Sequence, residues 1–245
     1  MKECSKSISR RLSDSNFINR YFVGKGLDIG GKPDPLNLYQ SLFCRMGHVK
    51  TWDREDGDAQ FLASVADGVF DFAHSSHCLE HLLDPAEGLK NWLRVIRPGG
   101  YLIVTVPDED LYEQGVFPST FNQDHRWTFT ILKSKSWSKS SLNVIDLVKG
   151  LGENAELVRL EQLSATYRFD FPRYDQSLTP VAESGIEFVI RKRSPSEIAA
   201  GGLRERAEAQ PDRETRIQLN QYRNDRQTLK RLNESVPPFT DDRDI

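Results

Sequence analysis

Histidines are concentrated in one short stretch of the chain, Phe70-Asp-Phe-Ala-His-Ser-Ser-His-Cys-Leu-Glu-His81. Residues 70–74 predict a strand, and the polar residues 75–81 predict a loop at its carboxyl end. The ordinary pKa of histidine lies near neutral, so these side chains could accept or donate a proton at physiological pH. Open α/β sheets bind their ligands at the carboxyl ends of the strands. Residues 75–81 are therefore the first candidate for a functional site.

Two acids and a glycine turn predict a cofactor that contains a ribose. Asp28 precedes Gly30-Gly31, and Asp53 follows 25 positions after Asp28, at the end of the next predicted strand. A carboxylate at that place can accept hydrogen bonds from both ribose hydroxyls. The turn lacks the G-x-G-x-x-G pattern, and Asp34 would place negative charge where a pyrophosphate binds. The pattern favours a cofactor without phosphate groups and disfavours NAD(P).

Alternating helices and strands must position these residues. A helix is predicted from Asp84-Pro85, because the carboxylate can cap it and proline suits its first turn. Further helices are predicted from Asp34-Pro35 to residue 46 and over residues 141–151. The predicted strands are residues 27–29, 48–53, 70–74, 101–106, 155–163 and 185–191. This order predicts an α/β, Rossmann-like fold: a mostly parallel sheet with helices on both faces and a late antiparallel hairpin.

The composition divides the chain into three segments. Residues 1–23 are predicted to be a helical, polar N-terminal segment, and residues 24–193 the main domain. Residues 107–140 of that domain lack periodicity and predict an acceptor loop over the site. Residues 194–245 are rich in charged and amide side chains, which predicts a partly helical or disordered tail through which the chain could form oligomers.

Charge and hydropathy exclude several classes of protein. The net charge of −3 and the isoelectric point near 6.0 give no basic signature, so no nucleic-acid partner is expected. The three cysteines are widely spaced, which indicates neither a disulfide framework nor a zinc site. No stretch approaches the roughly 20 apolar residues that cross a bilayer. We therefore expect a cytoplasmic protein without a membrane span.

Several motifs together resemble a known family. They are Leu27-Asp-Ile-Gly-Gly31, Asp53, Asp58-Ala59, Phe70-Asp71, Leu79-Glu-His81, Asp84-Pro85 and Arg94-Val-Ile-Arg-Pro-Gly-Gly100. This set resembles class I S-adenosylmethionine-dependent methyltransferases, and most of all the type 11-like branch associated with polysaccharide and O-antigen genes. The resemblance covers about residues 24–190. It implies a seven-stranded sheet, S-adenosylmethionine as cofactor, and methyl transfer to a small molecule or glycan precursor in polysaccharide biosynthesis.

The resemblance also implies which residues contact the cofactor. Asp53 would bind the ribose, and Asp58 would accept a hydrogen bond from the adenine amine. Lys32 stands where the family usually has a further glycine. The other implied contacts are Asp28, Gly30, Gly31, Ala59, Ser75 and Ser76.

The acceptor loop supplies the predicted catalytic group. His125, supported by Asp124 or Asp108, is predicted to be the general base for an acceptor hydroxyl, with His77 as the alternative. His81 could equally orient the helix that follows it. Three histidines could also suggest a metal site, but their spacing does not place the ligands on one element, so no metal is expected.

Two other functions stay open at this point. One is an NAD(P)-dependent oxidoreductase on a similar sheet, which the glycine turn disfavours. The other is a non-catalytic cofactor-binding or scaffold protein that acts through its C-terminal tail.

Overall fold

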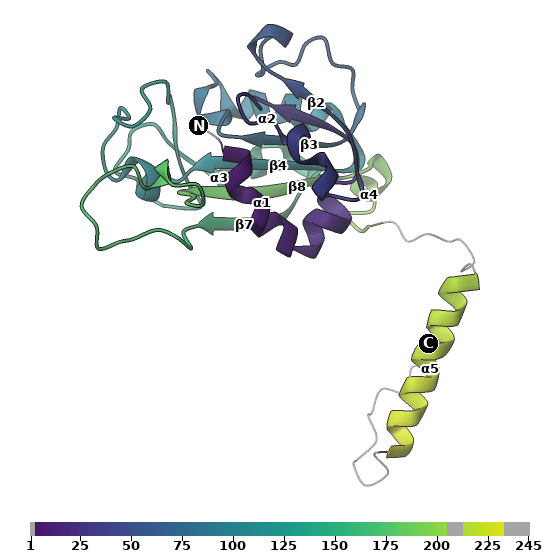
Figure 1. Ribbon diagram of the computed structural model, residues 1–245. Coiled ribbons are helices and arrows are strands. Elements are labelled where there is room, and N and C mark those ends of the chain that lie inside the picture. Colours follow the sequence, from purple (N-terminus) through teal and green to yellow (C-terminus); the bar gives the residue numbers. More distant parts are fainter. Residues whose placement is uncertain (1–2, 205–212, 233–245) are drawn as a thin grey trace. The chain divides into compact units, whose positions relative to one another are not determined.

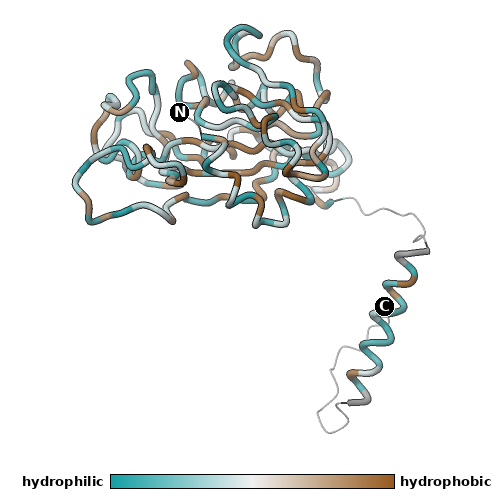
Figure 2. Tube along the Cα trace, in the orientation of Figure 1, coloured by the Kyte–Doolittle hydropathy of each residue, from teal (hydrophilic) through white to brown (hydrophobic). Residues whose placement is uncertain are grey.

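The chain divides into two compact units, Met1–Leu203 and Arg204–Ile245. The structure is a computed structural model, and it describes residues 3–204 and 213–232. The second unit contains α5 (Arg213–Leu232), a largely hydrophilic helix (Figure 2). Residues 194–203, assigned to the tail from the sequence, belong to the first unit instead. No helix within the described ranges is long and apolar enough to cross a membrane.

One sheet organises the first unit (Figure 1). Its six strands lie in the order β2-β1-β3-β4-β8-β7, one strand fewer than the resemblance implies. The first four are parallel, whereas β8 pairs antiparallel with both β4 and β7. This arrangement confirms the Rossmann-like fold and the late antiparallel hairpin. The strands are β1 (Gly24–Ile29), β2 (Met46–Trp52), β3 (Phe70–Ser76), β4 (Ile96–Pro107), β7 (Ala155–Leu163) and β8 (Gly185–Lys192).

The helix predicted from Asp84-Pro85 is α2 (Pro85–Arg94). Asp84 Oδ1 accepts hydrogen bonds from the amides of Ala86 and Glu87, so the predicted cap is confirmed. The first unit contains further helices besides α2. They are α1 (Glu3–Ser13), α3 (Val144–Gly150), α4 (Pro195–Ala199), η1 (Phe17–Tyr21), η2 (Leu36–Leu42), η3 (Arg54–Asp56), η4 (Leu79–His81), η5 (Glu109–Glu113), η6 (Gly152–Asn154) and η7 (Gln176–Leu178).

The prediction of an α-helix after the glycine turn is wrong. Only the 3₁₀ turn η2 forms there, and β2 already begins at Met46. Asp34 does not cap this turn, because its carboxylate accepts from the Ser5 amide and the Tyr39 hydroxyl. The Leu36 amide donates instead to Asp28 Oδ2, at 2.7 Å. Hydrogen bonds to other parts of the chain thus use the Asp34 carboxylate and the Leu36 amide, which would otherwise have started the helix.

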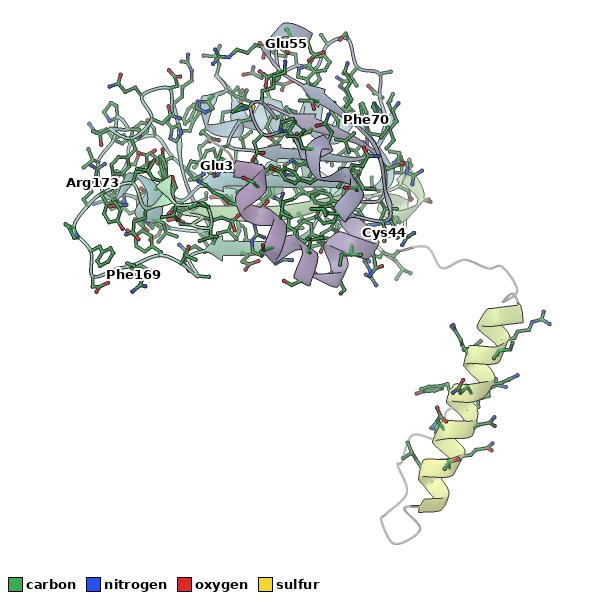
Figure 3. All side chains as sticks on the ribbon, in the orientation of Figure 1. Glu3, Cys44, Glu55, Phe70, Phe169 and Arg173 are labelled. Atoms are coloured by element: carbon green, nitrogen blue, oxygen red, sulfur yellow. The ribbon has the colours of Figure 1, made fainter. Side chains whose placement is uncertain are left out.

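The segment 107–140 contains some regular structure. It includes η5 and the strand β5 (Thr128–Thr130), which pairs in parallel with β6 (Ser141–Asn143) in a separate two-stranded sheet. The helix predicted from residue 141 therefore starts later, as α3 at Val144. Residues 164–184 join β7 to β8 and lie beside this segment, because Arg173 donates to the Glu113 carbonyl and packs over the Phe121 ring. Phe169 of the same connection is exposed at the outer edge (Figure 3).

Hydrophobic side chains cover both faces of the sheet. One face packs under α2 and α3, with Leu89 and Trp92 fully buried. The opposite face packs under α1 and η1, where Phe17, Phe22 and Phe72 form an aromatic cluster. The N-terminal segment is therefore part of the same core as the sheet.

Arg11 brings charge into this second face. It is 1% exposed, and its guanidinium donates to Glu187 Oε2 on β8 at 2.7 Å. It also lies 3.0 Å from His74 Nε2 on β3, and His74 Nδ1 lies 2.6 Å from Asp28 Oδ1 on β1. A guanidinium can only donate, so His74 Nε2 accepts and Nδ1 carries the proton given to Asp28. Burial and Arg11 both lower the pKa of His74, which is consistent with a neutral imidazole.

Glu187 is the acid of this network. Burial alone would raise its pKa, but Arg11 and Arg10 outweigh burial and lower it to about 2. Arg10 is more exposed than Arg11 and also pairs with Glu183. Arg11 is therefore the guanidinium whose charge is compensated only inside the protein.

We expect Arg11→Met to lower the free energy of unfolding by about 3 kcal/mol, because it removes one partner of a buried ion pair. The matched variant Arg10→Met should cost less, about 1 kcal/mol, since Arg10 is partly solvated. Denaturant unfolding monitored by tryptophan fluorescence measures both. Equal losses in the two variants would contradict the role given to Arg11.

The pH dependence of stability provides a second readout. Because the pKa of Glu187 is lower in the folded state, its ionised form stabilises the fold above pH 4.5, and this stability is lost as the pH falls toward 2. In Arg11→Met the pKa of Glu187 should rise, so the acid-induced loss should begin at a higher pH than in the parent protein.

Candidate active site

A cavity of about 190 Å³ opens at the carboxyl ends of β1 and β3. The glycine turn forms one wall, and the loop after β3 forms another. α1 forms a further wall through Glu3 and Cys4. Its lining residues include Asp28, Gly30, Gly31, Asp34, His74, Ser76, His77, Glu80, His81, Tyr112 and His125. The structure therefore places the candidate loop 75–81 and His125 around one space.

The glycine turn can hold no side chain. A Cβ atom on Gly31 would lie 2.2 Å from Asp28 Oδ2, and one on Gly30 would lie 2.7 Å from the Cys78 Cβ. Gly30 also has a positive φ of 71°. The backbone of this turn is thus left bare toward the cavity. Lys32 does not block it, because its ammonium is exposed and pairs with Glu55.

Asp28 positions the turn. It is 1% exposed, and its two carboxylate oxygens contact His74 and the Leu36 amide. These contacts join the glycine turn to the network of Arg11 on the same face of the sheet.

The predicted adenosine contacts lie along the edge of β2, outside the residues that line the cavity. Asp53 is half-buried and follows β2 directly, where its carboxylate accepts from the amides of Lys32 and Arg54. Asp58 is exposed and Ala59 half-buried. Of the two predicted serines, Ser76 lines the cavity, whereas Ser75 is fully buried and donates to the Ile29 carbonyl.

Three histidines surround one glutamate in what we call the histidine cluster: His77, Glu80, His81 and His125. Glu80 Oε1 lies 3.4 Å from His77 Nδ1, 4.0 Å from His81 Nε2 and 3.9 Å from His125 Nε2. The Glu80 side chain is fully buried, and neither of its oxygens has a hydrogen-bond partner among the residues that the structure describes. Burial would raise its pKa, but the three imidazoles, His77 first, outweigh burial and lower it.

His125 is held by an acid that the sequence did not indicate. Its Nδ1 lies 2.7 Å from Glu113 Oε1, and both side chains are almost fully buried. The predicted support by Asp124 or Asp108 is therefore wrong. The Asp124 side chain is exposed and only its backbone carbonyl contacts the cluster, at His81 Nδ1, while Asp108 caps η5.

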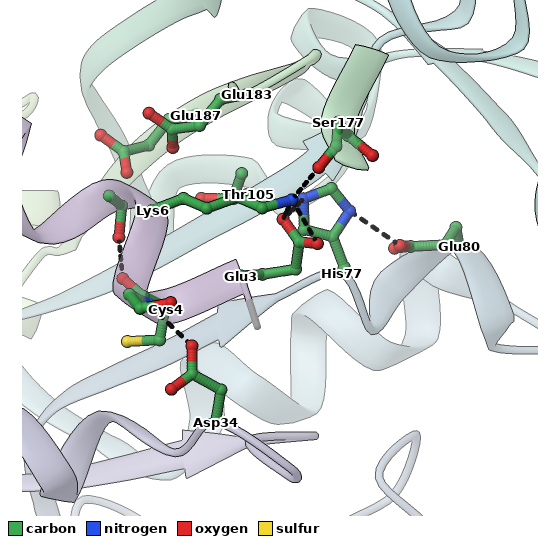
Figure 4. A network of polar contacts seen from close by, with 12 residues as sticks. Glu3, Cys4, Lys6, Asp34, His77, Glu80, Thr105, Ser177, Glu183 and Glu187 are labelled. Atoms are coloured by element: carbon green, nitrogen blue, oxygen red, sulfur yellow. Dashed lines mark hydrogen bonds and ion pairs between the residues drawn. The ribbon is translucent and has the colours of Figure 1, made fainter. Parts of the chain in front are cut away.

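His77 joins the cluster to α1 (Figure 4). Its Nε2 lies 3.6 Å from Glu3, and Lys6 of the same helix donates to the Ser177 carbonyl. Burial would lower the pKa of His77, but Glu3 and Glu80 outweigh it and raise the pKa. His77 also has a φ of 55°, a left-handed conformation that is uncommon for residues other than glycine. Such backbone strain is found most often at functional sites.

The cysteines near the cavity are poor nucleophiles. Burial raises the pKa of both Cys4 and Cys78 to about 12, so their reactive thiolate forms are scarce at neutral pH. The chemistry of the cavity therefore rests on imidazoles and carboxylates.

Sequence reasoning missed three residues of this site: Glu3, Glu80 and Glu113. Glu80 was visible in the Leu-Glu-His motif but was not given a role. Glu3 and Glu113 come from segments far apart in the chain, and no local pattern marks them. Tyr112 packs beside the His125 ring, with centroids 5.3 Å apart.

Comparisons with known proteins agree with this fold. Residues 17–134 match the family model described as a methyltransferase domain. A solved structure of a methyltransferase from Bacillus halodurans is similar to 76% of this chain and 99% of its own, with a TM-score of 0.50 and 14% identity. Phosphoethanolamine N-methyltransferase 2 of Haemonchus contortus, solved with S-adenosylhomocysteine, also gives a TM-score of 0.50 at 14% identity, over 76% of this chain and 53% of its own.

A curated relative is a protein of transposon TN4556 from Streptomyces fradiae. It is 43% identical over 56 residues, which is 23% of this chain and 16% of that protein. The match to it is thus confined to a small part of its length. Over residues 17–134, just under half of the chain, the family model and the observed Rossmann-like sheet agree on an S-adenosylmethionine-dependent methyltransferase domain.

Proposed function

We propose that the protein transfers a methyl group from S-adenosylmethionine to a hydroxyl group of a small molecule or glycan precursor. The observation that carries this proposal is one cavity that joins the bare glycine turn to the His125–Glu113 pair. A methyl donor held at the glycine turn would lie next to a group that can take a proton.

The cofactor fits the residues at its proposed site. Gly30 and Gly31 present backbone with no room for a side chain, which suits the methionine end of the molecule. Asp53 keeps unused acceptor capacity beside its two amide contacts, because an ionised carboxylate has about four acceptor positions. We assign the ribose hydroxyls to it. Asp58, Ala59 and Ser76 would complete the contacts.

The proposed cofactor supplies an electrophilic methyl group bound to a sulfonium sulfur. The chain must hold the acceptor oxygen in line with that bond. Such positioning can remove a large part of the entropic contribution to the activation barrier. Transfer of that methyl group to a hydroxyl would release the hydroxyl proton, which a residue of the cavity would have to accept. The wall that α1 forms would help to exclude water from this step.

His125 is suited to accept that proton. A carboxylate such as Glu113 can only accept, so His125 Nδ1 donates to it and Nε2 carries the lone pair. Glu113 would also stabilise the imidazolium once Nε2 is protonated. A general base typically increases the rate by roughly 10²–10⁴-fold. A hydroxyl is weakly acidic, so its reaction benefits from such a base. His77 is the alternative proton acceptor.

The fold also weakens the case for a nicotinamide cofactor. A dinucleotide site uses the first amides of a helix after the glycine turn to bind pyrophosphate. Here that position holds the short turn η2, and the Leu36 amide already donates to Asp28. Asp34 adds a buried acid nearby.

We expect Gly31→Ala to weaken binding of S-adenosylhomocysteine at least tenfold, because the added Cβ would displace the Asp28 carboxylate that shapes the turn. Gly150→Ala is the matched control, since a Cβ there meets nothing within 4 Å. Isothermal titration calorimetry on both folded variants measures the effect. Parent-like affinity in Gly31→Ala would remove the turn from the cofactor site.

Asp53→Ala should weaken the same ligand by about 1–3 kcal/mol, because the ribose loses a charged acceptor. Asp67→Ala is the control, as Asp67 is an exposed acid near the opposite, amino end of β3. Adenine, which has no ribose, should bind both variants and the parent equally. If Asp53→Ala also binds S-adenosylhomocysteine like the parent, the ribose assignment fails.

His125→Ala should slow methyl transfer at least a hundredfold while affinity for S-adenosylhomocysteine stays nearly unchanged. The rate can be followed by mass spectrometry of a cell extract supplied with isotopically labelled S-adenosylmethionine. His48→Ala, an exposed histidine on β2, is the control. A near-normal rate in His125→Ala contradicts the base assignment, and a loss in His77→Ala alone would move it to His77.

A further inference from the structure

We infer that Glu80, His81 and His125 form a binding site for a divalent cation of the zinc type. The three donors come from two separate segments, η4 and the residues before β5, which the fold brings together. Their ligand atoms all lie within 4.8 Å of one another. This inference concerns cation binding and does not depend on the proposed methyl acceptor.

Both imidazoles are oriented as metal ligands usually are. His81 Nδ1 lies 3.1 Å from the Asp124 carbonyl, which can only accept, so Nδ1 must donate and, in the neutral imidazole, Nε2 carries the lone pair. His125 Nδ1 donates to Glu113 in the same way. Both Nε2 atoms are those that face Glu80. In metal sites the second ring nitrogen of histidine donates to a carboxylate or a backbone carbonyl, and both versions occur here.

Glu80 provides the independent evidence for a ligand. Its side chain is fully buried, yet neither carboxylate oxygen accepts a hydrogen bond from any described residue. Burying an ionised carboxylate without hydrogen bonds is costly, so such a group needs compensation. A cation between Glu80 and the two imidazoles would compensate its charge directly.

The distances between the three ligand atoms suit a small cation if the side chains move slightly closer together. Nitrogen and oxygen ligands of zinc lie about 2.0–2.2 Å from the ion, so two of them can be about 4.2 Å apart at most. Glu80 Oε1 lies 3.9 Å from His125 Nε2 and 4.0 Å from His81 Nε2, within that limit.

The donor set selects the class of cation. Two imidazoles and one carboxylate are typical of zinc, and the same set binds iron(II) in oxygenases. Magnesium and calcium prefer oxygen ligands, and only Glu80 supplies them in this trio. The His81 side chain is 32% exposed, which leaves an entry path from solvent.

The test is a metal titration of untagged full-length protein after treatment with a chelator. We expect one Co²⁺ per chain with visible absorption bands of a low-coordinate site, displaced by Zn²⁺ and not by Mg²⁺. Zn²⁺ should also raise the melting temperature, because it binds only the folded state. Absence of one stoichiometric Co²⁺ or Zn²⁺ overturns the inference.

Variants locate the site. His81→Ala, His125→Ala and Glu80→Gln should each weaken Zn²⁺ binding at least tenfold, whereas His48→Ala should not. Glu113→Gln should weaken it 10–100-fold by loosening His125, the size of effect known for such outer partners. Circular dichroism confirms that each variant is folded. Unchanged affinity in folded His81→Ala and His125→Ala overturns the site even if metal binds elsewhere.

The same titration separates this inference from the proposed base. A bound ion takes the His125 Nε2 lone pair, so Zn²⁺ should inhibit methyl transfer if His125 is the base. If Zn²⁺ binds with the expected variant profile but leaves the rate unchanged, the cation site stands and the base assignment fails. If Zn²⁺ does not bind while His125→Ala is slow, only the cation site fails.

Discussion

The buried guanidinium of Arg11 is the interaction on which the site depends. It connects α1 to Glu187 on β8 and, through His74, to Asp28 on β1. An unpaired charge at that depth would be costly, so α1 can dock on the sheet only where Glu187 and His74 receive it. The docked helix places Glu3 and Cys4 in the wall of the cavity, and Asp28 in turn holds the glycine turn. One ionic network thus positions both α1 and the glycine turn, which line the same cavity.

The cavity has a different character at each end. At the glycine turn it offers bare backbone, and at the histidine cluster it offers imidazoles with a buried carboxylate. In the proposed function the glycine turn would face the methyl donor and the histidine cluster would face the acceptor. The ligand atoms of Glu80, His81 and His125 all lie within 4.8 Å of one another. That clustering is the physical basis for the proposed cation site.

The segments around the cavity are joined by contacts between distant residues. Arg173 ties the connection between β7 and β8 to the Glu113 carbonyl, and Lys6 of α1 reaches the Ser177 carbonyl of that connection. His77 lies between Glu3 and Glu80 with a strained backbone. These contacts mean that the acceptor side is built from four regions of the chain, and its shape depends on how they pack.

The sequence alone determined the sheet, because hydrophobic runs, the Asp84-Pro85 cap and the late hairpin are local signals. Its motifs also resemble those of class I methyltransferases, and that resemblance predicted the class. Tertiary structure decided the rest. The α-helix predicted after the glycine turn is absent because the Asp34 carboxylate accepts hydrogen bonds from Ser5 and Tyr39 and cannot cap it. The Leu36 amide donates to Asp28 instead. The pairing of His125 with Glu113, and the gathering of His81 and His125 around Glu80, depend on packing between segments that no spacing along the chain can encode.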